Sequence, residues 1–321
     1  MKYRSLGKTG IEVSEIGFGT WGLGGTSYGP TDDTISLNAI AKAIERGVNF
    51  FDTADIYGNG HSEKILGEAI SGIRDQVVIS SKGGYCDEHN KIGGQRLSSN
   101  HLRQALENSL RRLKCDYVDI YHLHSPDIEG IELTPILETL EEFKSDQLIH
   151  EYAISVRSPD CGLIAIERYG FSIIQVNFNL LDQRAIDNGL FELAASREAG
   201  IIVRTPLTFG FLTGVQDPEE RFSKLDHRSR WPVRQRRRWV DGAGMFDFIS
   251  GDHSKAQRGL RFCLDFEAVS TVIPGMLCED HVNENVEVSD SSPFSMEEHK
   301  KIRDTYKRST FADLETLDRS N

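Results

Sequence analysis

Long apolar runs, a leader-like start and an excess of positive charge are all missing from this sequence of 321 residues. No stretch approaches the roughly eighteen apolar residues of a membrane-spanning helix, and the opening MKYRSLGKTG lacks the apolar segment of a secretory signal. We therefore expect a cytoplasmic protein that does not interact with membranes. The formal net charge of −12, from 37 basic and 49 acidic residues, repels phosphate groups, so nucleic-acid partners are not expected.

Cysteine is scarce, and its spacing predicts neither disulfides nor a zinc site. The five cysteines are odd in number, widely separated and nowhere arranged as C-x-x-C, which is typical of thiols in a reducing compartment. His122 and His124 are placed by a period of two on one face of a strand, but no further ligands follow at suitable spacing. We therefore expect no bound metal.

Strand-like and helix-like segments alternate along the whole chain. Eight short runs rich in β-branched or aromatic residues are each followed by a longer segment with helical periodicity. The runs are SEIGFG, VNFFDTA, QVVISSK, DYVDIYHLH, HEYAISV, FSIIQVNFN, GIIVRTPL and VSTVIPG. Because parallel strands need helical crossovers, eight such units predict an α/β fold, a (β/α)8 TIM barrel. A doubly wound open sheet is the alternative that the same alternation allows.

We expect residues 1–321 to form a single barrel domain, since no linker or second pattern interrupts the eight units. The opening KYRSLGKTGIEVSEI alternates around a Gly-Lys-Thr-Gly turn and predicts an N-terminal β-hairpin. The longest irregular stretch follows the seventh strand, from Leu212 to roughly Gly251, and a loop of that length in a compact domain is usually functional.

The stretch GFGTWG, Gly17 to Gly22, has the G-x-G-x-x-G spelling of a dinucleotide-binding turn. In a Rossmann fold these glycines lead directly into a helix whose N-terminus binds the pyrophosphate. Here they are followed by LGGTSYGP, which is too rich in glycine and proline for a helical turn. The spelling is therefore accidental, and the segment is predicted to be the loop after the first barrel strand.

Four proton-handling side chains follow successive strands of the predicted barrel. Asp52 and Tyr57 follow the second strand, Lys82 ends the third and His124 ends the fourth. In such barrels the active site lies where the strands end. An ammonium group beside a phenol lowers the pKa of the hydroxyl, and a carboxylate keeps a buried lysine charged. With His124 orienting a substrate oxygen, these residues have the chemistry of carbonyl reduction if a hydride donor lies opposite.

At this point the chain resembles the aldo-keto reductase superfamily over nearly its whole length. The matching segments are FGTWGLGG, FDTADIYGNGHSEKILGEAI, KGG, LRRLKCDYVDIYHLHSPD, QVNFNLLDQ, PLTFGFLTG and VIPG followed by NEN. The resemblance implies that Tyr57 is the general acid-base, that Lys82 and Asp52 tune it and that His124 orients the substrate. It also implies that NAD(P)H binds to the barrel without a Rossmann motif.

The same resemblance implies a set of cofactor contacts. Val156 stands where relatives carry an asparagine that binds the carboxamide, and Asn177 is a candidate to replace it. Arg204 stands where many relatives carry an aromatic residue, and its guanidinium can also stack on a ring; a buried salt bridge is the alternative. The implied contacts are Gly19, Thr20, Trp21, Ser155, Gln175, Arg204, Thr205, Leu207, Gly210, Gly275, His281, Glu284 and Asn285.

The segment after the eighth strand departs most from the family pattern. Leu277, Cys278 and His281 stand where relatives carry residues that bind the 2′-phosphate of NADPH. Loss of a fixed cation at this position weakens the discrimination between NADPH and NADH. The resemblance to the family nevertheless favours NADP(H) over NAD(H) as the coenzyme. We hypothesise that His281 contacts the phosphate only when it is protonated.

Arginines crowd into HRSRWPVRQRRRW, residues 227–239, which we call the arginine-rich segment. Either they pair with nearby carboxylates on a short helix, or the segment folds over the cofactor or an anionic substrate. The aromatic residues Tyr28, Tyr85, Phe209 and Phe211 are expected near the mouth, where they suit a sugar-like carbonyl substrate.

The sequence thus predicts an NAD(P)H-dependent reductase of aldehydes or ketones with a small-molecule carbonyl or alcohol substrate. Two alternatives stay open. One is a barrel enzyme that retains its cofactor and catalyses epimerisation or elimination by transient redox. The other is a regulatory subunit that senses a nucleotide. The sequence indicates no oligomeric state.

Overall fold

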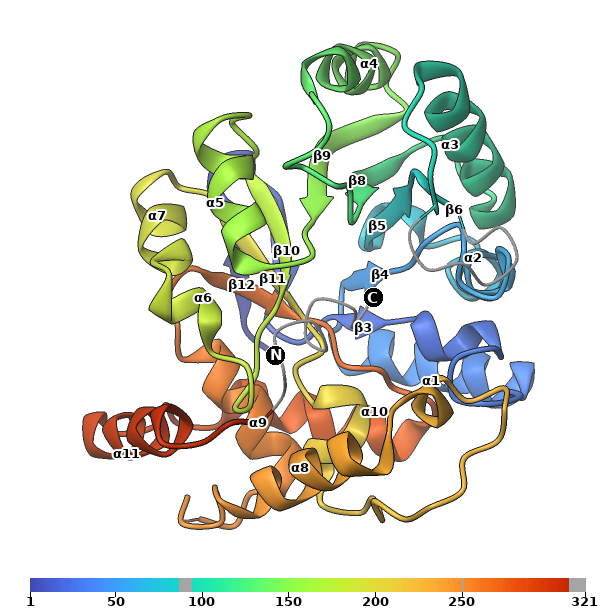
Figure 1. The fold of residues 1–321 in the computed structure, drawn as a ribbon. Coiled ribbons are helices and arrows are strands. Elements are labelled where there is room, and N and C mark those ends of the chain that lie inside the picture. Colours follow the sequence, from blue (N-terminus) through green and yellow to red (C-terminus); the bar gives the residue numbers. More distant parts are fainter. Residues whose placement is uncertain (87–93, 250, 312–321) are drawn as a thin grey trace.

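A ring of eight parallel strands forms the centre of the computed structural model, which describes residues 1–86, 94–249 and 251–311 (Figure 1). The strand order is β12-β11-β10-β9-β8-β5-β4-β3, and parallel bridges from Ile16 to Val272 and from Gly19 to Gly275 close the ring. The predicted (β/α)8 barrel is therefore confirmed. Its strands are β3 (Phe18–Gly19), β4 (Phe50–Asp52), β5 (Val78–Gly83), β8 (Val118–His124), β9 (Ile149–Ser155), β10 (Ile173–Asn177), β11 (Gly200–Arg204) and β12 (Val269–Val272).

Helices surround the strands on the outside of the ring (Figure 1). They are α1 (Asp33–Glu45), α2 (His61–Ala69), α3 (Ser99–Leu113), α4 (Thr134–Ser145), α5 (Pro159–Glu167), α6 (Arg184–Asp187), α7 (Leu190–Ser196), α8 (Val233–Gly244), α9 (Lys255–Leu264), α10 (Glu279–Val286) and α11 (Met296–Lys307). Local signals start several of them: the Asp32 carboxylate accepts the N–H groups of Thr34 and Ile35, and Ser254 and Gln257 form a capping box. Among the described residues no helix is long and apolar enough to span a membrane.

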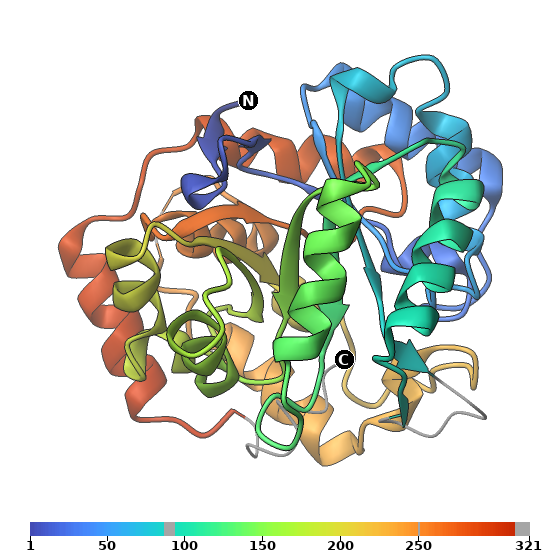
Figure 2. The same ribbon diagram turned by 90° about the horizontal axis from the view of Figure 1, so that it is seen from above.

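The predicted N-terminal hairpin is confirmed as β1 (Tyr3–Ser5) paired antiparallel with β2 (Glu12–Ser14). It lies at one end of the barrel, and α8 lies at the other (Figure 2). A second hairpin, β6 (Tyr85–Cys86) with β7 (Gly94–Gln95), follows β5. The hairpin β1–β2 therefore covers the end where the strands begin and leaves the opposite end to the loops that follow the strands.

Side chains inside the barrel change character along the strands. Near the strand starts the inward residues are apolar, and Phe50, Ile120, Ile173 and Ile202 form one cluster with Leu6 beside the first hairpin. Two and four residues further along, the period of two places polar residues on the same inner face. They are Asp52, Ser80, Lys82, His122, His124, Ser155, Gln175, Asn177 and Arg204. The interior of the barrel thus has an apolar layer near the strand starts and a layer of polar side chains towards the strand ends. We call the space between these polar side chains the polar chamber.

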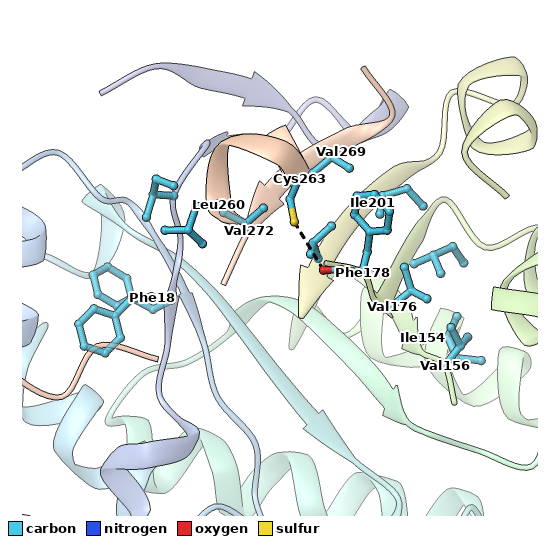
Figure 3. Close-up of a cluster of buried hydrophobic side chains, with 14 of the residues drawn as sticks. Phe18, Ile154, Val156, Val176, Phe178, Ile201, Leu260, Cys263, Val269 and Val272 are labelled. Carbon is cyan, nitrogen blue, oxygen red and sulfur yellow. Dashed lines mark hydrogen bonds between the residues drawn. The ribbon is translucent and has the colours of Figure 1, made fainter. Parts of the chain in front are cut away.

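The outward residues of the same strands form the larger core. Figure 3 shows Ile201 of β11 and Val269 of β12 against Leu260 and Cys263 of α9. The Cys263 thiol donates to the carbonyl of Phe178 at 3.5 Å, so this buried cysteine is a structural residue. Packing on the outer face fixes the strands, and the strands in turn fix the chamber inside them.

The segment after β11 contains more structure than the sequence predicts. Two short 3₁₀ turns, Thr208–Thr213 and His227–Arg230, are followed by α8, whose buried side includes Trp239 and Ala243. The sequence predicts an irregular stretch from Leu212 to Gly251 because its arginines and glycines leave few apolar residues at helical spacing. Tertiary packing on the barrel end overrides that weak pattern.

Candidate active site

The four proton-handling residues meet in the polar chamber. Asp52 ends β4, Tyr57 lies in the following loop, Lys82 is on β5 and His124 ends β8. Lys82 Nζ donates to Asp52 Oδ1, to the carbonyl oxygen of Thr53 at 2.8 Å and to Tyr57 Oη at 3.4 Å. One ammonium group therefore connects the carboxylate with the phenol.

Two glycines hold the Tyr57 loop against the loop after β3. A Cβ atom on Gly24 would lie 2.6 Å from the backbone nitrogen of Gly58, and Gly58 itself has a φ of +59°. Both positions therefore require glycine, because any larger residue would push the two backbones apart. This close approach fixes where the phenol enters the chamber.

Lys82 is fully buried and charged. Burial by itself lowers the pKa of the amine, but the Asp52 carboxylate and the Tyr57 oxygen act the other way and leave the pKa above its usual value. The ammonium form is therefore the stable one at neutral pH. A permanent positive charge lies beside the phenol.

Tyr57 differs from the simple expectation. Burial raises the pKa of the phenol above its usual value, the Lys82 and Arg204 cations oppose this rise, and Asp52 adds to it. Lys82 lowers the pKa of the phenol as predicted, but desolvation outweighs the ammonium group and the net pKa stays above its usual value. Tyr57 keeps its proton at neutral pH, which is the state that a proton donor needs.

His124 is a neutral imidazole. Burial, with the Lys82 and Arg204 cations, holds the pKa of His124 well below its usual range. Its ring is edge-on to Tyr57 with centroids 6.0 Å apart, and Tyr85 lies 5.4 Å away on another side. The histidine is thus suited to hydrogen bonding beside the phenol rather than to carrying a charge.

The second carboxylate oxygen of Asp52 has partners that the sequence reasoning missed. Asp52 Oδ2 accepts from Ser80 Oγ at 2.9 Å and from Gln175 Nε2 at 2.8 Å. Ser155 Oγ donates to Gln175 Oε1 at 3.1 Å, and His122 Nε2 lies 2.9 Å from Ser80 Oγ. The available signal was the strand period, because Ser80 and His122 each lie two residues before a predicted site residue.

The predicted contacts after β3 lie close to the four central residues. Thr20 Oγ1 donates to the carbonyl of Asp52 at 2.9 Å, and the ring of Trp21 is 6.5 Å from that of Tyr57. Trp21 also packs on His227, with centroids 4.5 Å apart. Gly19 is tightly packed, since a Cβ there would lie 2.7 Å from the carbonyl oxygen of Ile273. As predicted, no α-helix follows these glycines but only a short 3₁₀ turn, Trp21–Gly24.

The turn after β11 combines predicted contacts with backbone strain. Positive φ angles occur at Thr205, Thr208, Phe209 and Gly210, and Thr208 Oγ1 is buried without a hydrogen-bond partner among the described residues. Strained residues with unsatisfied polar groups are typical of ligand-binding turns. Leu207 lies in the same turn. The turn therefore fits the pyrophosphate role that the resemblance implies.

Arg204 and Asn177 occupy the chamber beside that turn. Arg204 Nη2 donates to the carbonyl of Val156 at 2.9 Å, and burial lowers the pKa of Arg204 to about 10, so it remains a cation. Thr205 Oγ1 donates to Asn177 Oδ1. The Arg204 guanidinium thus contacts Val156, which stands where relatives carry an asparagine. The side-chain oxygen of Asn177, the candidate to replace that asparagine, already accepts a hydrogen bond from Thr205.

Three of the contacts predicted after β12 lie on α10, His281 in its first turn and Glu284 and Asn285 in its last. His281, Glu284 and Asn285 are three and four residues apart and therefore share a face of the helix. A Cβ on Gly275 would meet no described atom within 4 Å beyond its chain neighbours, so the space beside this glycine is open. Leu277 packs on Gly22, and its N–H donates to His281 Nδ1 at 3.2 Å.

Three arginines of the arginine-rich segment contact residues of the loop that precedes it. Arg228 forms a bidentate pair with Asp226, and Arg237 pairs with Glu219. Arg236 Nη1 donates to the carbonyl of Glu220 at 2.5 Å. These contacts favour the first of the two interpretations, arginines paired on a short helix. Of the aromatic residues expected at the mouth, Phe211 is fully buried against Trp239, so that expectation was wrong for Phe211.

Comparisons with known proteins agree with this geometry. The model of the aldo/keto reductase family matches residues 15–307. Aldo-keto reductase YhdN of Bacillus subtilis (strain 168) is 34% identical over 250 residues, which cover 75% of this chain and 72% of that protein. NADH-specific methylglyoxal reductase of Escherichia coli (strain K12) is 38% identical over 233 residues, 67% of this chain and 70% of that protein. The holo form of aldo-keto reductase AKR11C1 from Bacillus halodurans has a TM-score of 0.81 and 28% identity, covering 98% of this chain and 99% of its own.

Proposed function

The chain belongs to the aldo/keto reductase family, and from that premise we propose that it reduces an aldehyde or ketone to an alcohol with NAD(P)H, using Tyr57 as the proton donor. The observation that carries the proposal is the contact of Lys82 Nζ with both Tyr57 Oη and Asp52 Oδ1. It supplies a protonated phenol next to a fixed positive charge. A carbonyl oxygen that gains negative charge during reduction needs both.

Each central residue has a separate task in this proposal. Tyr57 donates its proton to the substrate oxygen, and the Lys82 ammonium stabilises the phenolate that remains. Asp52 keeps Lys82 charged and in place. Neutral His124 holds the substrate oxygen beside the phenol by a hydrogen bond. The carbonyl oxygen of Thr53 accepts a further hydrogen bond from the Lys82 ammonium group and helps to fix its orientation.

The residues present fit a nicotinamide dinucleotide. When bound, such a cofactor supplies a hydride to the substrate carbon. Gln175 and Ser155 would hold the carboxamide, the turn from Thr205 to Gly210 would hold the pyrophosphate, and Glu284 with Asn285 would hold the adenine end. Two observations support this assignment: the buried Thr208 hydroxyl has no hydrogen-bond partner among the described residues, and the space beside Gly275 is open.

We propose NADP(H) as the preferred coenzyme, with His281 as the phosphate contact. His281 Nδ1 already accepts the Leu277 N–H, which leaves Nε2 to meet a 2′-phosphate. His281→Leu should therefore lower the affinity for NADPH relative to NADH. Fluorescence titration of the wild type and the variant with both coenzymes tests this. An unchanged affinity ratio, or a preference of the wild type for NADH as in the name of the Escherichia coli relative, would contradict it.

We propose a hydroxylated, sugar-like carbonyl as substrate. Tyr85 lies beside His124, and Trp21 packs with Tyr28 at a centroid distance of 5.5 Å, so aromatic surfaces border the catalytic groups. Such faces stack on sugar rings and aromatic aldehydes alike. The polar chamber supplies hydrogen-bond partners for hydroxyl groups.

The deciding experiment incubates the purified protein with aldehydes, ketoses and sugar nucleotides together with reduced nicotinamide. We expect loss of reduced nicotinamide in a one-to-one ratio with alcohol formed. Conversion of substrate without net coenzyme turnover would instead support epimerisation or elimination. Tight coenzyme binding without conversion of any compound would support a nucleotide-sensing regulatory subunit.

A further inference from the structure

His122 is a buried imidazole that the proposed reaction does not use. It lies on β8, two residues before His124, and its side chain is completely buried inside the barrel. Its Nε2 is 2.9 Å from Ser80 Oγ, and Ser80 Oγ is 2.9 Å from Asp52 Oδ2. Its Nδ1 has no hydrogen-bond partner among the described residues. A chain of two hydrogen bonds therefore leads from His122 to the carboxylate that holds Lys82.

The direction of these hydrogen bonds follows from the donors available. An ionised carboxylate only accepts, so the single hydrogen of the Ser80 hydroxyl goes to Asp52. Ser80 Oγ must then accept from His122, which requires the hydrogen of the imidazole to be on Nε2. Burial, together with the nearby Lys82 and His124, holds the pKa of His122 well below its usual range. The ring is therefore neutral and acts as a fixed donor.

With Ser80 in place, Asp52 receives hydrogen bonds from three side chains: Lys82 on Oδ1, and Ser80 and Gln175 on Oδ2. Donors of this kind disperse the negative charge of a carboxylate. The charged groups that face Tyr57 are Lys82, Asp52 and Arg204, and its titratable neighbours include the neutral His124 and Tyr28. Burial raises the pKa of the phenol most, and among the charged groups Asp52 is the one that raises it further. Dispersing its charge therefore favours proton release.

We propose that Ser80 and His122 are positioning residues for the reductase reaction: His122 orients the Ser80 hydroxyl onto Asp52, and this contact limits the charge that Asp52 presents to Tyr57. The inference rests on the proposed function in one respect only, namely that Tyr57 is the proton donor. Neither residue touches the substrate. Both act through the carboxylate.

The test compares Ser80→Ala with Ser81→Ala. Ser81 is the next residue on the same strand, and its hydroxyl donates at 2.7 Å to the buried Glu63 carboxylate on the outer side of the barrel. It is a matched control, since each variant removes one serine–carboxylate hydrogen bond but only Ser80 faces Asp52. The measurement is the pH profile of kcat for carbonyl reduction, together with KM for the coenzyme.

Ser80→Ala should move the alkaline limb of the profile to higher pH by roughly half a unit to one unit and lower kcat by up to about tenfold at neutral pH, because a less acidic phenol is a weaker donor. KM for the coenzyme should stay constant. Ser81→Ala should leave the limb in place even if it lowers stability. Superimposable profiles for Ser80→Ala and the wild type would overturn the proposal.

The His122 variants separate hydrogen bonding from packing. His122→Gln retains an N–H donor at similar reach and should restore most of the wild-type profile, whereas His122→Leu should behave like Ser80→Ala. If His122 only fills space, the two variants should lower kcat and shift the pH profile to the same extent. That result would overturn the role of the imidazole as a hydrogen-bond donor.

A second measurement does not depend on activity. NMR of the histidine ring nitrogens in isotope-labelled protein, with the His122 signal assigned by its loss in His122→Gln, reports the tautomer directly. We expect a neutral ring with the hydrogen on Nε2 throughout the neutral pH range. A hydrogen on Nδ1 would direct the Ser80 hydroxyl to the imidazole and overturn the chain, whether or not the protein reduces carbonyls.

Discussion

Replacement of Lys82 by methionine removes the charge beside Tyr57 while keeping a side chain of similar length. The variant leaves Asp52 buried with Ser80 and Gln175 as its remaining side-chain donors. If the ammonium group stabilises the phenolate, the variant must lose most of its activity. If Lys82 only fills space, the variant should keep its activity.

The size of the effect follows from the separation of the two groups. At the observed 3.4 Å between Lys82 Nζ and Tyr57 Oη, an effective dielectric constant of about 20 gives an attraction of roughly 5 kcal/mol between the ammonium group and the phenolate. This is an upper bound, because the site can relax around the substituted side chain. We therefore expect kcat to fall by about 10²- to 10⁴-fold, the usual range for a positioned acid.

The assay follows reduced nicotinamide absorbance under steady-state and single-turnover conditions. Coenzyme affinity, measured by tryptophan fluorescence, serves as the control for an intact fold. In Lys82→Ala, added alkylamines should restore part of the lost rate, because they can place an ammonium group in the space that the shorter side chain leaves. Retention of more than about a tenth of wild-type kcat with an unshifted pH profile would refute the electrostatic role of Lys82.

Three further predictions concern the surroundings of the site. Arg112→Met should cost about 3–5 kcal/mol in urea unfolding, because Arg112 Nε, at 2.6 Å, neutralises the fully buried Glu63; a cost below about 1 kcal/mol would show the pair to be screened. Burial and the nearby Glu63 carboxylate raise the pKa of Asp55 from about 4 to about 7. The protonated form of Asp55 therefore stabilises the fold at low pH, and this contribution to the free energy of unfolding is lost as the pH rises through about 7. Asp55→Asn should therefore flatten the dependence of stability on pH over that interval, and an unchanged slope would contradict it. Gly24→Ala should lower both Tm and kcat, because its Cβ would meet the Gly58 nitrogen at 2.6 Å and displace the Tyr57 loop; unchanged values would refute that contact.

The barrel and its four central residues could be predicted because both depend on local patterns. Eight apolar runs that alternate with helical segments without a linker favour a parallel barrel over an open sheet, and each of Asp52, Lys82 and His124 stands at the end of such a run. The strand ends of a barrel meet at one mouth whatever the details of packing. Residues far apart in the sequence could therefore be assigned to one chamber.

The remaining features depend on three-dimensional packing. The net pKa of Tyr57 follows from burial, which no spacing in the sequence reports. No pattern in the sequence connects Ser80 or His122 with Asp52, and only the strand register brings them to it. Helix α8 arises in a segment with little apolar periodicity, and it forms because Trp239 finds a buried position at the end of the barrel.

The most direct measurement of the central claim is the single-turnover rate of hydride transfer in Tyr57→Phe. This variant removes one oxygen and keeps the ring that packs against Trp21 and His124. With an aldehyde that the wild type reduces, we predict a rate about 10²- to 10⁴-fold lower and an unchanged affinity for the coenzyme. A rate equal to that of the wild type would show that another group supplies the proton.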